Sequence, residues 1–251
     1  MFENRKLVKA ALALAVCSSL AGAQTFFGLS TGGGPSTRVP SRAAADAART
    51  SFMGSLVGVG TEDFEGIAAG TPPPIGLVCP GAGTATLVSP LGGSVTFQGP
   101  GTNGVGRYPS SGVHFFNTGS ASSGPTFHVD FSTTVAAFGF YGIDVGDFGS
   151  QLSLKFWLAG VVVDTWALPY LASSGTGSLM DGSMMYAGYI RTSGFDRVDF
   201  VGTSSADFFA FDDMTVGSVE SVHPTVPEPA SLALLGTGLI GLYAVARRRR
   251  A

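Results

Sequence analysis

Charged residues and cysteine are scarce in this chain. Charged residues make up only 12% of its 251 residues, whereas glycine occurs 37 times. Low charge with many turn formers is typical of an all-β extracellular domain rather than a helical one. The two cysteines are Cys17 and Cys79. Cys17 lies in a segment that we expect to be removed, so no disulfide framework is predicted and Cys79 should be a buried or free thiol.

The familiar catalytic motifs are also missing. The sequence contains no HExxH, Walker A, GxSxG or CxxC pattern. Gly99–Gly104 matches GxGxxG, but the chain continues into Val105–Pro109 with a pattern that does not begin a helix. A dinucleotide site needs that helix, because its N-terminus binds the pyrophosphate. We therefore expect a protein that is not an enzyme.

Basic residues are rare between the two ends of the chain. The stretch Leu56–Glu220 holds four basic and fourteen acidic residues, a net charge of −10. Nucleic-acid binding requires basic patches that neutralise phosphates. The acidic balance argues against nucleic acid as a partner and is compatible with divalent cations.

The C-terminal tail has three parts. The motif Pro227-Glu228-Pro229 precedes an uncharged apolar run, Ala230–Ala246, and the run is followed by four arginines, Arg247, Arg248, Arg249 and Arg250. As a helix the run would be roughly 25 Å long, slightly short of a bilayer core of about 30 Å. Arginine side chains that reach toward the headgroups can make up the difference. A buried core helix is the alternative, but it would not need an arginine cluster. The sequence predicts a transmembrane helix at 230–246 with the basic tail 247–251 in the cytoplasm.

This tail resembles the PEP-CTERM sorting signal of exopolysaccharide-producing Gram-negative bacteria. The resemblance implies that an exosortase, a membrane-embedded protease, is a partner and cuts near the Pro-Glu-Pro motif. It also implies association with the inner membrane before processing, and with exopolysaccharide or biofilm afterward.

The N-terminus has the features of a secretory signal peptide. Arg5, Lys6 and Lys9 precede an apolar segment, Ala10–Leu20, and small residues end at Ala23. We expect residues 1–23 to form the signal helix, with cleavage between Ala23 and Gln24. A lipoprotein signal ending at Cys17 is a weaker alternative. Export with a C-terminal stop places the body in the periplasm first, and then at the cell surface or in the extracellular matrix.

The exported part divides into three segments. Residues 24–55 are rich in small residues without a sustained period, so we expect a flexible lead-in, although Ala43–Met53 fits a short helix. Residues 56–220 form the predicted body, and 221–229 form a proline-containing tether.

The body is expected to be a two-sheet antiparallel β-sandwich of jelly-roll type. Its candidate strands, nine to eleven in all, are short and separated by turn residues. Leu152–Leu158 and Val161–Trp166 alternate around Ala159-Gly160 and predict a β-hairpin. The other clearest candidates are Thr84–Val88, Gly93–Phe97, Phe127–Phe131, Val135–Tyr141, Met185–Arg191, Asp196–Val201 and Phe208–Val216.

Two acidic motifs lie at opposite ends of the body. Asp63-Phe64-Glu65 opens it and Asp212-Asp213 nearly closes it. This pairing resembles extracellular jelly-roll carbohydrate-binding modules, in which such acids meet and hold a structural calcium ion. The resemblance implies Glu65 and Asp213 as calcium ligands. Asp212 is the weaker candidate, because strand alternation points it to the opposite face. The alternative is that these acids are solvated strand ends.

Three functions remain open from the sequence. The first is a non-catalytic surface or matrix protein sorted by its tail. The second is a calcium-stabilised glycan-binding module, which needs an exposed aromatic platform or an acidic groove. The third and least favoured is a polysaccharide-active enzyme with paired carboxylates. The aromatic residues considered for sugar stacking are Trp157, Trp166, Tyr108, Tyr141, Tyr170, Tyr186 and Tyr189.

Overall fold

The computed structural model describes residues 22–119, 126–146, 150–169, 181–203 and 207–222. Residues 1–21 of the predicted signal helix, the Pro227-Glu228-Pro229 motif, the helix at 230–246, the arginine cluster and Tyr170 lie outside these residues. Within the described ranges no helix is both long and apolar enough to cross a membrane.

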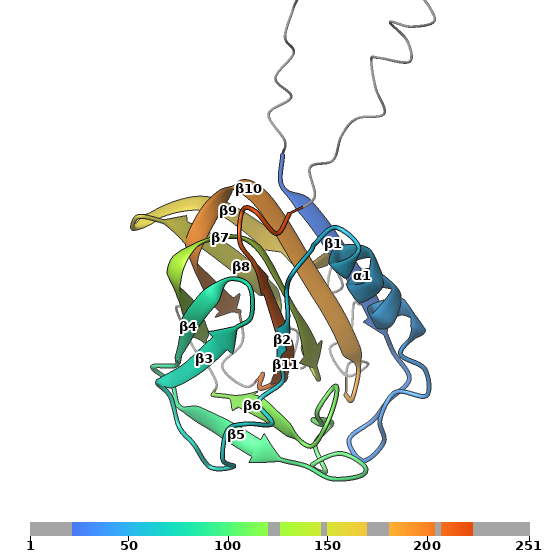
Figure 1. Ribbon diagram of the computed structural model, residues 1–251. Helices are drawn as coiled ribbons and strands as arrows, with labels where there is room; N and C mark the ends of the chain where they lie inside the picture. Colours follow the sequence, from blue (N-terminus) through green and yellow to red (C-terminus); the bar gives the residue numbers. More distant parts are fainter. Residues whose placement is uncertain (1–21, 120–125, 147–149, 170–180, 204–206, 223–251) are drawn as a thin grey trace, which may run out of the picture.

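The body consists mostly of antiparallel strands, as the low charge and frequent glycine predict (Figure 1). One helix, α1 (Ala43–Met53), lies among eleven strands of the described part. The strands are β1 (Gln24–Ser30), β2 (Thr61–Glu62), β3 (Ile75–Cys79), β4 (Gly83–Val88), β5 (Gly93–Phe97), β6 (His114–Thr118), β7 (Phe127–Ile143), β8 (Leu152–Leu158), β9 (Val161–Ala167), β10 (Met184–Gly202) and β11 (Ala210–Gly217).

Hydrogen bonds join all of these strands into one sheet. Its main order is β5-β6-β11-β7-β10-β8-β9, with β1 added to β10, β2 to β11, β4 to β7, and β3 to β4. The two separate sheets that we expected are not confirmed. The long strands β7 and β10 account for this difference, because each was predicted as two short strands. They stay paired across register shifts between Ile190 and Arg197, so the sheet continues through the bend.

The sheet curves so that its two halves share one core. Phe127 and Phe200, from the first half of β7 and the second half of β10, stack with their centroids 4.0 Å apart. Phe211 of β11 approaches Phe127 at 5.3 Å, and Phe140 of β7 approaches Phe200 at 5.0 Å. Rings from both ends of the long strands therefore meet in the centre, as in a β-sandwich-like body.

The segment 24–55 is part of this body, which corrects the expectation of a flexible lead-in. β1 pairs with β10 from Gln24 to Ser30, and α1 packs on β1 and β10. Ala45, Ala48 and Phe52 form the buried face of the helix. The small residues that suggested a loose segment instead let β1 and α1 pack closely, since a Cβ at Gly28 would collide with the Ala44 carbonyl oxygen.

Two strand glycines make room for α1. Gly139 of β7 lies opposite Gly188 of β10, and the Phe52 ring covers both. A Cβ at Gly188 would stand 2.7 Å from a Phe52 ring atom. The helix can therefore lie directly on this part of the sheet, and it brings its polar face beside β11.

The β8–β9 hairpin matches its prediction. Leu152, Leu154 and Phe156 of β8 point inward, and the turn places Ala159 and Gly160 at positive φ, 50° and 78°. Cys79 is likewise a buried free thiol among the described residues. Burial raises the pKa of that thiol to about 12, with a smaller contribution from Glu62.

Candidate functional site

Asp212 and Asp213 are brought to the same side of β11. Strand alternation predicted opposite faces, and that prediction is wrong. Asp213 has a φ of +48°, and the pairing of β11 with β7 shifts between Asp212 and Thr215. This irregularity turns the second carboxylate back toward the first, as bulges in strands do.

Both carboxylates bind the segment Ser110–Ser111. The Ser110 hydroxyl lies 2.8 Å from Asp212 Oδ2 and 2.8 Å from Asp213 Oδ2. The Ser110 amide also donates to Asp212 at 2.6 Å, and the Ser111 hydroxyl donates to Asp213 at 2.7 Å. One hydroxyl has one proton to donate, so two ionised carboxylates cannot both accept from it. Burial, with the neighbouring Asp213 charge as the next cause, raises the pKa of Asp212 well above its usual value.

Glu65 binds the same loop from its other end. Its Oε1 accepts hydrogen bonds from the amides of Val113 and His114, both at 2.6 Å. Glu65 and Asp213 therefore meet the same loop, Ser110–His114, but at different residues.

These carboxylates do not fit the predicted calcium site. Calcium needs six to eight oxygen ligands, whereas oxygens of Glu65 and Asp213 face N–H and O–H donors. Within the described ranges no three His, Cys, Asp or Glu side chains gather closely enough to hold a metal ion. The acids instead fasten a loop. Calcium binding itself stays a prediction.

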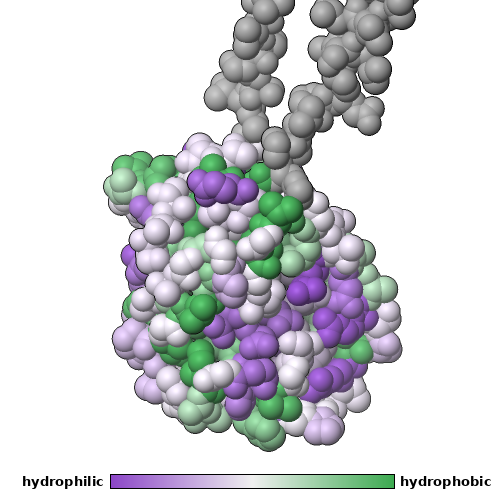
Figure 2. Space-filling model, in the orientation of Figure 1, coloured by the Kyte–Doolittle hydropathy of each residue, from purple (hydrophilic) through white to green (hydrophobic). Residues whose placement is uncertain are grey.

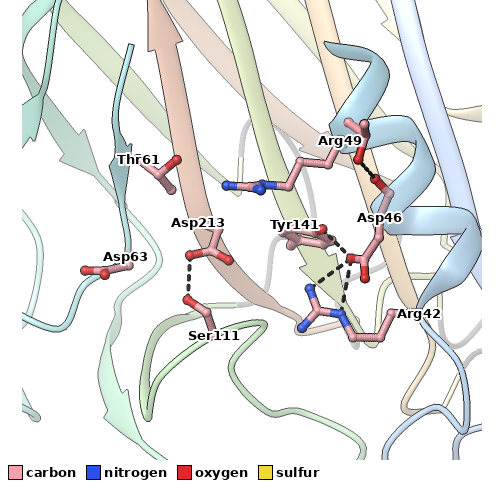
Figure 3. A pocket seen from close by; sticks show the side chains of 9 residues that line it. Arg42, Asp46, Arg49, Thr61, Asp63, Ser111, Tyr141 and Asp213 are labelled. Atoms are coloured by element: carbon pink, nitrogen blue, oxygen red, sulfur yellow. Dashed lines mark hydrogen bonds and ion pairs between the residues drawn. The ribbon is translucent and has the colours of Figure 1, made fainter. Parts of the chain in front are cut away.

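A polar pocket opens beside Asp213. It has a volume of about 520 Å³ and lies between α1, β2 and β11 (Figure 3). Figure 2 shows hydrophilic residues gathered on this face. We define the polar pocket by its lining residues, which are Arg42, Asp46, Arg49, Thr50, Thr61, Asp63, Ser111, Tyr141 and Asp213.

One wall of the polar pocket is rigidly paired. Asp46 Oδ1 accepts hydrogen bonds from Arg42 at 3.0 and 3.2 Å and from the Tyr141 hydroxyl. Arg42 also donates to the Ser110 carbonyl. Burial and the Asp46 hydrogen bond raise the pKa of Tyr141, so this phenol stays protonated.

Arg49 stands apart from this network. Its side chain extends from α1 toward Asp213 and Thr61 (Figure 3). Its Nε atom is buried and has no hydrogen-bond partner, and within the described part of the chain no carboxylate lies within ion-pair distance of it. An unpaired buried N–H is costly in free energy. Among these lining residues, Arg49 is thus the cation that has no carboxylate partner.

A second pocket surrounds Trp157. It has a volume of about 420 Å³, and the residues that line this Trp157 pocket are Asp130, Phe131, Trp157, Gly160, Asp196 and Arg197. Trp157 Nε1 donates to Asp199 at 2.9 Å, and the Arg197 guanidinium lies 5.9 Å from the indole centroid. The half-buried indole is therefore fixed in place by Asp199, in a pocket that also contains the carboxylates of Asp130 and Asp196 and the guanidinium of Arg197.

Most of the aromatic residues that we considered for sugar stacking are buried, which excludes them as stacking surfaces. Tyr108, Tyr141, Tyr186 and Tyr189 are at most 1% exposed. Trp166 is half-buried and stacks on Tyr189. Among the described candidates, Tyr141 and Trp157 line pockets, and of these two Trp157 is the one that is only half-buried.

Sequence reasoning missed Arg49, Ser110 and Ser111. A helical period does place Arg42, Asp46 and Arg49 on one side of the helix that begins at Ala43, about a quarter turn from the buried face of Ala45, Ala48 and Phe52, and this signal could have revealed the wall. For the serines no comparable signal exists, because their partners lie about a hundred residues away.

Comparison with known protein families gives a match at the C-terminal end of the chain. Residues 225–250 match the family model of the PEP-CTERM protein-sorting motif. No curated protein matches the chain in sequence. The match covers the Pro-Glu-Pro motif, the apolar run and the arginines. The chain therefore carries a PEP-CTERM sorting signal, which marks it as an exported protein sorted by an exosortase.

Proposed function

We propose that this protein is a non-catalytic surface or extracellular-matrix protein that associates with exopolysaccharide after exosortase processing. The sorting motif at 225–250 carries the proposal. The precursor would be held in the inner membrane by the segment 230–246 with its body in the periplasm. Cleavage near Pro227-Glu228-Pro229 would then release the body to the surface.

The C-terminal end of the described body supports this arrangement. Val57 donates its amide to the Ser221 carbonyl at 2.8 Å, and Leu56 forms an isolated bridge with Val222. The chain is therefore bound to the body up to Val222. Both described termini lie at one end of the molecule (Figure 1), and the face with the polar pocket lies along its side.

Fractionation of cells tests the sorting role. Deleting the chain from Val226 onward, or replacing Glu228 with Ala, should leave the body in a different fraction from the wild type. Pro224→Ala alters a proline just outside the matched residues and should not change the location. An unchanged location of the deletion variant would refute the proposal.

A glycan-binding body is the second candidate, and the Trp157 pocket favours it. An indole next to Asp130, Asp196 and Arg197 combines a stacking surface with hydrogen-bonding groups for sugar hydroxyls. Trp157→Ala should reduce retention on immobilised exopolysaccharide, and Trp166→Ala, which changes an indole outside the pocket, should not. Equal retention of the two folded variants would exclude this pocket.

The absence of catalysis is part of the proposal. Asp212 is fully buried and Asp213 is only 6% exposed, so this carboxylate pair is poorly placed to flank a glycosidic bond. Incubating the protein with polysaccharide should release no new reducing ends. Release that is lost in Asp213→Asn would overturn this part of the proposal.

A further inference from the structure

We propose that the polar pocket binds a single sugar residue that is neutral or carries an amino group, and that it discriminates against acidic sugars. This inference rests on the proposed association with polysaccharide and adds a site and a specificity to it. It concerns a different pocket from that of Trp157.

The polar pocket contains carboxylate oxygens that can still accept hydrogen bonds. Asp46 accepts hydrogen bonds from Arg42 and Tyr141 at Oδ1, and Asp63 accepts one from the Glu65 amide at Oδ1. Among the described residues, none donates a hydrogen bond to Oδ2 of either carboxylate. Asp213 lines the same space. A ligand that donates several hydrogen bonds fits these carboxylates, and sugar hydroxyls do so.

Arg49 supplies the complementary group. Its guanidinium lines the polar pocket together with Asp63 and Asp213 but forms no ion pair with either carboxylate. A ligand that accepts a hydrogen bond from Arg49 and donates hydrogen bonds to the carboxylates would connect these unpaired groups. A hydroxyl group can accept and donate at once, which makes adjacent hydroxyls on one ring the best match.

The charge balance sets the specificity. The charge of Arg42 is neutralised by Asp46, which lies 3.0 Å away. The remaining charged side chains of the pocket are one cation, Arg49, and two carboxylates, Asp63 and Asp213. This net negative charge favours neutral or ammonium-bearing rings and repels carboxylate or sulfate groups. The lining side chains are also held in advance, Asp213 by Ser110 and Ser111, and Asp46 by Arg42 and Tyr141. Such preorganisation lowers the entropy cost of binding.

Binding measurements on the intact protein test the inference. The probes are dextran oligomers, chitosan oligomers and polygalacturonate oligomers, which present neutral, amino and acidic sugars. Wild-type protein should bind at least one of the first two and bind polygalacturonate at least about tenfold more weakly. Arg49→Gln should weaken binding by about tenfold or more, as expected for loss of a charged hydrogen-bond partner. Arg191→Gln makes the same chemical change outside both pockets and should leave the affinity unchanged.

A second variant tests the charge argument. Asp63→Asn keeps the size of the side chain but removes one negative charge, so it should narrow the difference between dextran and polygalacturonate. Equal affinity of the wild type for all three probes would overturn the specificity. Unchanged affinity in Arg49→Gln, with binding lost in Trp157→Ala, would refute the polar pocket and leave the glycan association standing. If native exopolysaccharide also fails to bind wild-type protein, the association itself is refuted.

Discussion

The carboxylates of Asp212 and Asp213 lie at equal distances, 2.8 Å, from the hydroxyl oxygen of Ser110. Neighbouring residues of a regular strand would point to opposite faces. Here a positive φ at Asp213 turns both onto one loop. The pair anchors the Ser110–His114 loop at one end, and Glu65 anchors it at the other. This loop forms part of the polar pocket through Ser111.

Removing the shared hydroxyl should destabilise the body. Ser110→Ala leaves two buried carboxylates without their common partner, and we expect a loss of about 1.5–3 kcal/mol in the free energy of unfolding. Urea denaturation measures this loss. Ser111→Ala removes a single hydrogen bond from a more exposed residue and should cost less. Equal losses in the two variants would contradict the special role of Ser110.

Stability should fall as the pH rises from about 4 to about 7. Burial is the main cause that raises the pKa of Asp144 to about 7, against opposing effects of the Gly182 amide and Arg107. An acid whose pKa is higher in the folded state stabilises the fold fully below its unfolded pKa, and that contribution is lost as the pH rises through the folded pKa. The window for Asp144 therefore runs from about pH 4 to about pH 7. Asp144→Asn should flatten this part of the melting-temperature profile, and an unchanged slope would count against Asp144.

Glu65 should stabilise the body without calcium. Its carboxylate accepts from two backbone amides, so Glu65→Gln should lower the melting temperature by the same amount in EDTA and in saturating calcium. Thermal unfolding in both buffers measures this. If calcium raises the midpoint of the wild type but not that of the variant, Glu65 is a calcium ligand and the predicted site is restored.

The packing of α1 on the sheet depends on the absence of a side chain at Gly188. Gly188→Ala would place a Cβ 2.7 Å from the Phe52 ring, and overpacking of this kind costs about 1–3 kcal/mol. Gly76→Ala is the matched control, because a Cβ on that strand glycine meets nothing within 4 Å. Chemical denaturation should show that the free energy of unfolding of Gly188→Ala is lower than that of Gly76→Ala by this amount. If they unfold at the same denaturant concentration, the helix does not rely on this contact.

Local patterns predicted much of the fold. The alternation of Leu152–Leu158 and the Ala159-Gly160 turn predicted β8 and β9, and Ala43–Met53 was identified as a short helix. Residue spacing could not reveal that the pairs of predicted strands at 127–141 and 185–201 are single strands. A bend and a bulge leave the same local signal as a turn, and only the pairing partner distinguishes them.

The sequence by itself determined the sorting signal, because the Pro-Glu-Pro motif, the apolar run and the arginines are contiguous and can be recognised from their composition and order alone. It also determined the acidic, strand-rich character of the body. Only the tertiary structure decided what Glu65, Asp212 and Asp213 do, and it alone placed Arg49 opposite Asp63 and Asp213. The physical reason is distance along the chain. The polar pocket joins a helix near residue 46 to a strand near residue 213, and its geometry depends on a backbone irregularity at Asp213 and on glycines that let α1 approach the sheet.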